Sequence, residues 1–166
     1  MVYTLTRLNE CWSSFSAGRQ EDYLFQLRDL YRLAGWWSES VDTLEKLGRI
    51  ISGSHCFVAA IQEASSGRIL GMGRAISDRA SDAYIQDIMV RPEARRRAIA
   101  SSIVKVIVER LEQDGMTWIG LIAKQGTLPF YRGLGFSEIP GAMPMLRKNE
   151  IIQEGPAVLN PSRKKI

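Results

Sequence analysis

Three consecutive arginines, Arg95, Arg96 and Arg97, stand between an apolar-rich run and a long apolar segment. Guanidinium groups bind phosphate oxygens through charge-assisted hydrogen bonds. A helix that begins directly after such a turn adds unpaired backbone N–H groups and the positive end of its dipole, and both suit a phosphate. The small side chains of Ala98 and Ala100 would let a ligand approach the backbone closely. The stretch therefore predicts an anion-binding turn at the start of a helix.

A second residue suited to chemistry is Tyr131, which lies in the run F-Y-R-G-L-G-F from Phe130 to Phe136. We expect Tyr131 on a short helix that a glycine ends, with its amphipathic ring packed and its hydroxyl free to donate a proton. Taken alone, the same pattern also fits a core tyrosine whose hydroxyl is already satisfied.

The arginines must be positioned by the elements on either side of them. The run from Tyr84 to Val90 predicts a strand, which Arg91 and Pro92 close. The block 98–114 contains many β-branched residues, which favour a strand by propensity. It is nonetheless too long for an ordinary strand, Gly115 is placed as a helix C-cap, and apolar residues recur every fourth position. The block therefore predicts a helix with a broad buried face, packed on a sheet.

The rest of the chain predicts further strands and helices around this unit. A loop is predicted over 9–20, and a bulge or close backbone approach at Gly71 and Gly73. The predicted helices run from Glu21 to Gly35 and from Ser40, as N-cap, to Gly53. The predicted strands lie within 1–8 and over 55–63, 68–77 and 117–123, with a hairpin turn at 65–67. Three consecutive strands then form an antiparallel meander, and the crossover helix makes the last strand parallel to its neighbour.

The segment R-R-R-A-I-A resembles the acetyl-CoA loop of the GNAT acyltransferase superfamily. The family pattern is Arg or Gln, two residues, Gly, one residue, then Gly or Ala. Arg95 takes the first position and Ala100 the last, but Ala98 stands where the family has glycine, and its methyl group would crowd a pyrophosphate. The run F-Y-R-G-L-G-F is similar to the family's F-Y-x-x-x-G-F. Two such matches in the right order identify the chain as a member of the superfamily.

This resemblance implies the fold and the domain boundaries. The fold class is α/β (α+β), with a mixed, mostly antiparallel sheet of about six to seven strands flanked by about four helices. Residues 1–148 would form a single GNAT domain, and 149–166 a C-terminal extension that is extended or mobile. Within the superfamily, Gly35-Trp36, G-R-A-I-S-D and Q-D-I-M-V-R-P resemble serotonin or arylalkylamine N-acetyltransferase-like members. That narrower match covers about half of the chain and says less about the substrate, because acceptors change while the fold persists.

The implied reaction transfers the acetyl group of acetyl-CoA to a primary amine of a small molecule, without a metal. Tyr131 would be the general acid that protonates the departing thiolate, and a backbone N–H from the strand ending at Val90 would polarise the carbonyl. Residues that would contact acetyl-CoA come from the strand, the loop, the helix start and the second motif: Ile88, Met89, Val90, Arg95, Arg96, Arg97, Ala98, Ile99, Ala100, Ser101, Gln125 and Tyr131.

The general base and the acceptor contacts are less defined by the sequence. Asp87 is the candidate base if its carboxylate faces the acceptor, and a salt bridge to a nearby arginine is the competing interpretation. Trp36 and Asp78 are candidates for contact with the acceptor, although paired tryptophans usually pack in a core. A different class also stays open, because Ala98 fits a catalytically weak acyl-CoA-binding or interaction module. The retained Tyr131 favours the enzyme.

Composition and charge limit the other possibilities. The chain has 166 residues, 45% of them apolar and 24% charged, as in ordinary globular domains. Its net charge of +4 comes without a long basic stripe interleaved with aromatics, so we expect no nucleic-acid partner. One histidine, His55, leaves no His-based zinc cluster, and Cys11 and Cys56 are expected as free thiols. Without a leader or membrane-spanning run we expect a cytoplasmic protein and no membrane partner. A homodimer is an option.

Overall fold

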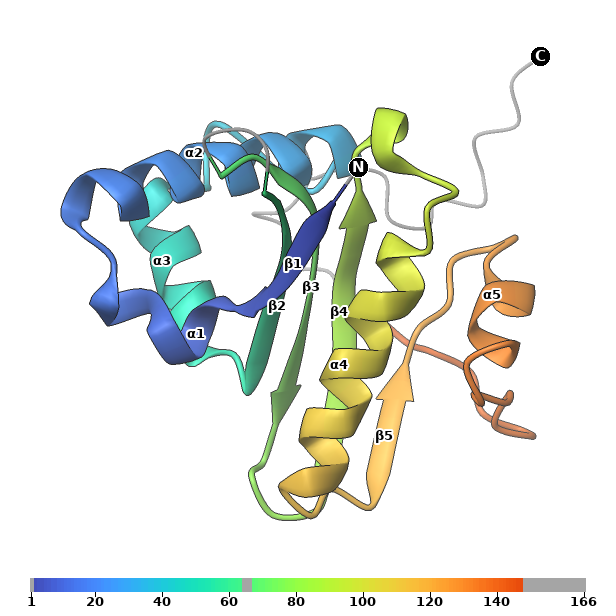
Figure 1. Ribbon diagram of the computed structural model, residues 1–166. Coiled ribbons are helices and arrows are strands. Elements are labelled where there is room, and N and C mark those ends of the chain that lie inside the picture. Colours follow the sequence, from blue (N-terminus) through green and yellow to red (C-terminus); the bar gives the residue numbers. More distant parts are fainter. Residues whose placement is uncertain (1, 64–66, 148–166) are drawn as a thin grey trace.

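The computed structural model describes residues 2–63 and 67–147. In these residues five strands form one sheet in the order β1-β2-β3-β4-β5 (Figure 1). Neighbouring strands are antiparallel from β1 to β4, and β5 joins β4 in parallel. The strands are β1 (Tyr3–Arg7), β2 (Cys56–Gln62), β3 (Ile69–Ser77), β4 (Asp82–Val90) and β5 (Trp118–Leu121).

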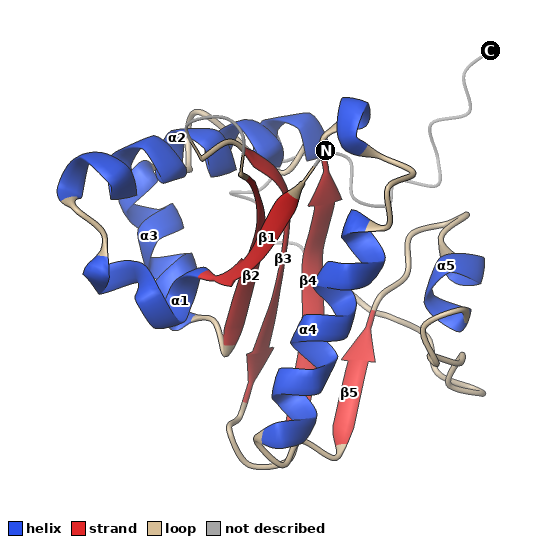
Figure 2. Ribbon diagram, viewed as in Figure 1, coloured by secondary structure: helices blue, strands red, loops and turns tan. Residues whose placement is uncertain are grey.

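Helices cover the two faces of the sheet unequally (Figure 2). One face packs against α2 and α3, which follow the short helix α1, and on the other face α4 is the helix that the described residues supply. The helix α5 lies beyond β5. The bounds are α1 (Leu8–Cys11), α2 (Ala17–Ala34), α3 (Leu44–Gly53), α4 (Ile99–Gln113) and α5 (Leu128–Arg132), with 3₁₀ turns η1 (Trp12–Ser14) and η2 (Pro92–Ala94).

Side-chain alternation along the central strands builds two apolar cores. Val58 faces α4, whereas its neighbours Phe57 and Ala59 face α2 and α3. On α4, Ile103 and Ile107 are fully buried against the sheet. Burial of this apolar face outweighs the weak helix propensity of β-branched residues, since each such side chain gains about 1.5–3 kcal/mol on burial. The predicted helix with a broad buried face is therefore confirmed.

Two helix starts differ from the sequence predictions because side chains cap the backbone there. Most of the stretch predicted as a loop over 9–20 is helical, and α2 already begins after Ser16, whose hydroxyl accepts the N–H of Arg19. The second helix is capped by Thr43 rather than Ser40, since the Thr43 hydroxyl accepts the N–H of Lys46. Both caps satisfy first-turn N–H groups, as expected for these residue types.

The sheet has fewer strands in the described residues than the six to seven predicted. Residues 137–147 follow α5 as irregular chain and turn without a ladder partner. Pro140 and Pro144 lie in this stretch, and proline cannot donate a ladder hydrogen bond. The predicted extension 149–166 lies outside the described residues. Within those residues no helix is long and apolar enough to cross a membrane.

Candidate active site

The site begins where β4 and β5 separate. Their ladder joins only Asp82–Ile85 to Trp118–Leu121, so in the described chain the second half of β4 has no strand beside it on that edge. The N–H of Arg91 donates to the Leu70 carbonyl on β3 at 2.8 Å. Because backbone groups of successive strand residues point to opposite edges, the N–H and C=O of Val90 point into the gap between β4 and β5.

A β-bulge in β4 changes which residues face this gap. Arg74 pairs with Gln86 and Met72 pairs with Met89, so two residues of β4 lie opposite Gly73. The first of the two, Asp87, has a left-handed backbone with φ 59°. A side chain at Gly73 would collide with Ile88, whose Cδ1 lies 2.4 Å from the position of a Cβ there. The bulge predicted at this part of β3 is therefore present, and the space beside Gly73 is filled by side chains rather than by a neighbouring backbone.

Helix α4 starts beside the gap with free N–H groups. Ile99, Ala100 and Ser101 have backbone N–H groups without a protein partner among the described residues, as at most helix starts. The Ser101 hydroxyl donates to the Ala98 carbonyl at 2.8 Å, and the N–H of Ser102 donates to the same oxygen at 2.9 Å. The first turn is thus ordered while its outward N–H groups stay available to an anion.

Ala98 is not the first residue of the helix but its N-cap, in the left-handed conformation with φ 59°. A left-handed alanine costs about 1–2 kcal/mol relative to the right-handed form. Glycine adopts this conformation without that cost. The high helix propensity of alanine therefore gives no advantage at this position, because Ala98 lies outside the helical backbone.

The arginine loop places its three side chains differently. Arg95 donates from Nε to the Val90 carbonyl at 3.3 Å, which holds the loop against the end of β4. Arg95 and Arg96 both line the space in front of the α4 start, whereas Arg97 does not line it. All three side chains are exposed. The loop thus offers two guanidinium groups beside the free N–H groups of α4, and both kinds of donor suit a phosphate group.

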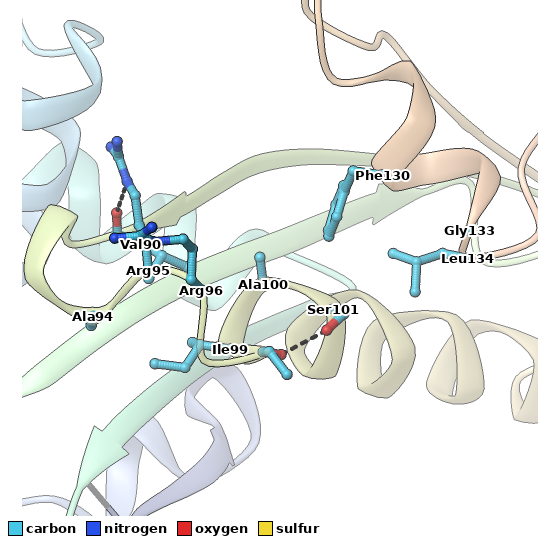
Figure 3. A pocket seen from close by; sticks show the side chains of 11 residues that line it. Val90, Ala94, Arg95, Arg96, Ile99, Ala100, Ser101, Phe130, Gly133 and Leu134 are labelled. Carbon is cyan, nitrogen blue, oxygen red and sulfur yellow. Dashed lines mark hydrogen bonds between the residues drawn. The ribbon is translucent and has the colours of Figure 1, made fainter.

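Two adjoining cavities occupy the gap. The larger, of about 420 Å³, lies between the arginine loop, the first turn of α4 and the α5 region, and Figure 3 shows Phe130 and Leu134 facing Ala100 across it. The smaller, of about 260 Å³, continues along β4. It is lined by Ile88, Met89, Val90, Arg95, Ala100, Thr127, Phe130 and Tyr131. The predicted loop, strand and second motif are therefore brought together at one groove.

Tyr131 lies on α5, and Gly133 follows the helix as predicted. Its ring meets Phe130 and Phe136 edge to face, with centroids 4.9 Å and 6.0 Å apart. Burial raises the pKa of the Tyr131 phenol above its ordinary value, and nearby Tyr84 raises it further. The hydroxyl therefore keeps its proton at neutral pH, and a protonated phenol lining the smaller cavity has the state that a general acid needs.

Asp87 makes the salt bridge that the sequence left as an alternative. Its Oδ2 accepts Nε of Arg74 at 2.6 Å and the hydroxyl of Tyr31 at 2.8 Å. Burial, with the Asp87 charge as the next cause, raises the pKa of Tyr31 far above its ordinary value, so this phenol stays protonated. Trp36 meets the Tyr31 ring edge to face at 6.1 Å. Asp87 and Trp36 thus belong to one connected cluster on the α2 side of the sheet.

Two predicted site residues lie outside this arrangement. Asp78 is at the far end of β3, where its Oδ1 accepts the N–H groups of Ala80, Ser81 and Asp82 at 2.8–3.0 Å and closes the turn. These backbone donors lower the Asp78 pKa to about 2. Gln125 is exposed in the loop before α5 and lines neither cavity.

Sequence reasoning missed two residues that the structure adds. Tyr31 and Arg74 are separated from Asp87 by 56 and 13 positions, so only the tertiary fold joins them. The available signal was strand register: Arg74 alternates with apolar residues on β3 and points to the side that holds Tyr31. A buried arginine on a strand requires a carboxylate, and Asp87 was the acidic residue in the neighbouring strand centre.

Comparison with known proteins gives a consistent result. The model of the acetyltransferase (GNAT) family matches residues 10–136. An uncharacterised N-acetyltransferase, ycf52, of Porphyra purpurea is 29% identical over 118 residues, which cover 70% of this chain and 66% of that protein. Histone acetyltransferase TAP1 of Glycine max is 30% identical over 135 residues, covering 76% and 56%. The chain thus spans about half to two thirds of these relatives' lengths.

One further relative bears on the resemblance to serotonin N-acetyltransferases, and one solved structure bears on the fold. Serotonin N-acetyltransferase 2, chloroplastic, of Oryza sativa is 30% identical over 80 residues, which are 48% of this chain and 40% of that protein. It is therefore a partial match. The solved structure of a GNAT-family acetyltransferase of Streptococcus pneumoniae superposes with a TM-score of 0.68 at 21% identity, covering 90% of this chain and 99% of that one. This likeness shows the fold.

Proposed function

The chain belongs to the acetyltransferase (GNAT) family, and from this premise we propose that it transfers the acetyl group of acetyl-CoA to the primary amine of a small molecule. The observation that carries the proposal is the groove with its two adjoining cavities. It joins the arginine loop, the free edge of β4 and the Tyr131 side chain. These are the three features that holding a phosphate, polarising a thioester and protonating a thiolate would require.

The donor would be held mainly by backbone groups. The N–H groups of Ile99, Ala100 and Ser101 would bind the pyrophosphate, with Arg95 and Arg96 neutralising its charge. The N–H of Val90 points into the smaller cavity and would donate to the thioester carbonyl. Such a donor is worth most when charge develops on the oxygen during reaction.

The reaction would proceed by direct attack of a neutral amine on the thioester carbon. A C–N bond forms, the C–S bond breaks, and the departing thiolate takes the proton of the Tyr131 hydroxyl. The amine loses a proton to a carboxylate or water, and the phenol is then reprotonated from solvent. Asp87 has its Oδ2 already engaged by Arg74 and Tyr31, so a water relay through its other oxygen fits better than direct proton transfer.

The acceptor we propose is an arylalkylamine or a similar small amine. Trp36 and Tyr31 supply aromatic surface beside the Asp87 carboxylate, a combination that suits an aromatic ligand carrying a cationic amine. The relatives' names include both a serotonin and a histone acetyltransferase. Serotonin and lysine both present a primary amine, so the names agree with this acceptor chemistry and leave the choice between small molecule and protein to experiment.

The second candidate is a catalytically weak acyl-CoA-binding module. One observation favours it: the Ala98 methyl stands at the N-cap of α4, in the cavity where the pyrophosphate would lie. The protonated Tyr131 at the groove favours the enzyme. The two candidates differ in turnover and not in binding.

The test measures free thiol released from acetyl-CoA over a panel of amines that includes arylalkylamines, polyamines and a lysine peptide. Binding of acetyl-CoA is measured in parallel by calorimetry. Release with at least one arylalkylamine above the rate without acceptor supports the proposed reaction. Binding without release from any amine would establish the module instead. Faster release with the lysine peptide than with every small amine would move the acceptor to proteins.

The placement and partners of the protein stay predictions. A cytoplasmic location was expected from the sequence, and relatives from Arabidopsis thaliana and Oryza sativa are named as chloroplastic. The homodimer and the expected lack of nucleic-acid and membrane partners are likewise proposals. Size-exclusion chromatography with light scattering would determine the assembly.

A further inference from the structure

Three side chains form a clamp on the β4 bulge. The Asp87 carboxylate accepts hydrogen bonds from Arg74 on β3 at 2.6 Å and from Tyr31 on α2 at 2.8 Å. The side chains of Arg74 and Asp87 are only 14% and 19% exposed. Hydrogen bonds to an ionised group in such a partly buried position are stronger than those between neutral groups. The clamp therefore ties three elements to one strained residue.

The strained residue needs that support. Asp87 has a φ of 59°, a conformation that aspartate visits more readily than most residues but still at a cost. Strain of this kind persists only where surrounding contacts hold it. The two hydrogen bonds of the clamp are such contacts, because both are made to the Asp87 side chain itself. Without them, Asp87 would favour ordinary extended backbone, and the bulge would shift along β4.

The bulge determines which way the side chains and backbone N–H groups point in the residues that follow it on β4. Ile85 and Val90 both pack toward α4, although an unbroken strand would place residues five apart on opposite faces. The extra residue corrects the alternation. The same correction turns the N–H of Val90 into the gap while the N–H of Arg91 points to β3. A slip of one residue would turn the Val90 N–H away from the smaller cavity.

We propose that Tyr31 and Arg74 are positioning residues, which hold Asp87 in its left-handed conformation and thereby aim the Val90 N–H at the thioester carbonyl. The inference rests on the proposed function, since it gives that N–H its role. It also assigns Asp87 a part in donor binding that differs from accepting a proton. Neither Tyr31 nor Arg74 needs to touch acetyl-CoA for this effect.

The test compares affinities for acetyl-CoA and for CoA, so no turnover is needed. The two differ by the acetyl group, which carries the thioester carbonyl. Arg74→Met should lower the preference for acetyl-CoA over CoA by about 2- to 10-fold, the worth of one hydrogen bond. Tyr31→Phe, a milder change in case the first variant folds poorly, should lower it in the same direction. Arg32→Met is the matched control. Arg32 lies next to Tyr31 on α2 and forms an exposed ion pair with Glu39, so its loss should leave the preference for acetyl-CoA unchanged.

Rescue by glycine separates positioning from direct contact. Glycine holds a positive φ without a clamp, so Asp87→Gly should keep the preference for acetyl-CoA within about twofold of the wild type. In that background, Arg74→Met should add no further loss, because the two changes act through the same backbone. If Arg74→Met leaves the preference intact, or Asp87→Gly lowers it as much as Arg74→Met does, the inference is wrong. Lack of turnover with every amine would overturn the proposed function and leave this result standing.

Discussion

At the residue scale, the groove depends on a few side chains whose state the fold determines. Tyr131 is kept protonated by burial beside Tyr84. Asp87 is held by Arg74 and Tyr31. Ala98 occupies a backbone conformation that glycine prefers. Tyr131 and Ala98 lie in different elements, so each gives a separable prediction.

The Tyr131 hydroxyl has a measurable role if it is the general acid. Tyr131→Phe should lower kcat by about 10²–10⁴-fold, the usual contribution of general acid catalysis. CoA affinity and melting temperature should change little, because the ring contacts with Phe130 and Phe136 remain. Kinetics from pH 6 to 11 provide the check.

The pH profile of the two enzymes adds a second criterion. The Tyr131 pKa lies above the ordinary value of about 10, so the wild type loses its proton only at the alkaline end. The difference between wild type and variant should therefore be constant near neutrality and shrink only there. A variant with normal kcat but a lower melting temperature would make Tyr131 a structural residue.

Within a helix, replacing alanine by glycine lowers stability, but at the left-handed Ala98 we expect the opposite effect. Ala98→Gly should raise stability by about 1 kcal/mol, because glycine adopts φ 59° without strain. The matched control is Ala100→Gly, which lies within α4 and should lower stability by about 1 kcal/mol. Urea denaturation of both variants measures this contrast.

The Ala98 variant also tests whether the methyl group obstructs the donor. Removing it should tighten CoA binding in calorimetry, because the residue lines the larger cavity at the proposed pyrophosphate position. Equal affinity in variant and wild type would show that the groove already accommodates alanine, and the module interpretation would lose its one support.

At the scale of elements, the arginine loop and the α4 start line one cavity and would together bind an anion. Arg95 lines both cavities and Arg97 lines neither, which gives a matched pair in a single turn. Arg95→Ala should weaken acetyl-CoA binding by about tenfold or more, as for a hydrogen bond to a charged group. Arg97→Ala should weaken it much less.

Salt is the control for this electrostatic effect. The loss caused by Arg95→Ala should shrink as ionic strength rises, because exposed charges are screened within about 10 Å at 0.1 M salt. Calorimetric titrations at low and high salt measure both variants. Equal losses for the two arginines would mean that the loop attracts CoA by net charge alone.

The β3–β4 turn is an element whose stability should follow pH. Backbone donors lower the Asp78 pKa to about 2, below the unfolded value of about 3.9. A lowered carboxyl pKa contributes stability above the unfolded pKa and loses it as pH falls through the folded one. Asp78→Ala should therefore lower the melting temperature at pH 7, and the difference should disappear between pH 4 and pH 2.

The Asp78 variant also separates this turn from the groove. Since β4 runs about 27 Å from Asp82 to Val90, acetyl-CoA affinity and amine KM should not change in Asp78→Ala. An increase in amine KM without loss of stability would restore Asp78 as an acceptor residue.

At the scale of the whole molecule, buried His55 links the sheet to α4 at the end opposite the groove. Its Nδ1 lies 2.5 Å from the Ser77 hydroxyl oxygen and its Nε2 lies 2.7 Å from Asp114 Oδ2, so β2, β3 and the end of α4 meet at one ring. His55→Ala should destabilise the fold by about 1–3 kcal/mol, because buried partners lose their hydrogen bonds.

The effect of His55→Ala on the groove should be small. The start of α4 lies about 20 Å from its end, since the helix has 15 residues. Acetyl-CoA affinity measured at a temperature where the variant is folded should match the wild type. A parallel loss of stability and affinity would show that α4 transmits changes from one end to the other.

Much of this molecule could be predicted from local sequence patterns. The strand at 84–90, the arginine turn and α4 follow from periodicity, from Pro92 and from the glycine cap at Gly115, whose φ is 85°. Tyr131 was placed correctly on a short helix because the glycine that ends it is adjacent in sequence. Structural features that are determined by residues close in sequence could therefore be predicted.

Features that depend on distant contacts were not predicted. The bulge residue Asp87 is defined by Gly73 on another strand and by Tyr31 on α2. The start of α2 depends on whether Ser16 caps a helix or lies in a loop, and its Ser-rich surroundings favoured the loop. Asp78 has a carboxylate that could contact an amine acceptor, but this carboxylate accepts backbone N–H groups of its own turn. Residue type and local spacing cannot distinguish these outcomes.

Where β4 and β5 separate, the groove is bordered by backbone N–H groups of Val90, Ile99, Ala100 and Ser101. This affects which mutations such a site tolerates. An amide survives almost any substitution at its own position, provided that the local φ and ψ are kept. Substitution of side chains would therefore leave the proposed donor site intact as long as the backbone is unchanged. At Ala98, with its φ of 59°, the backbone angle is accordingly the feature that a substitution has to preserve.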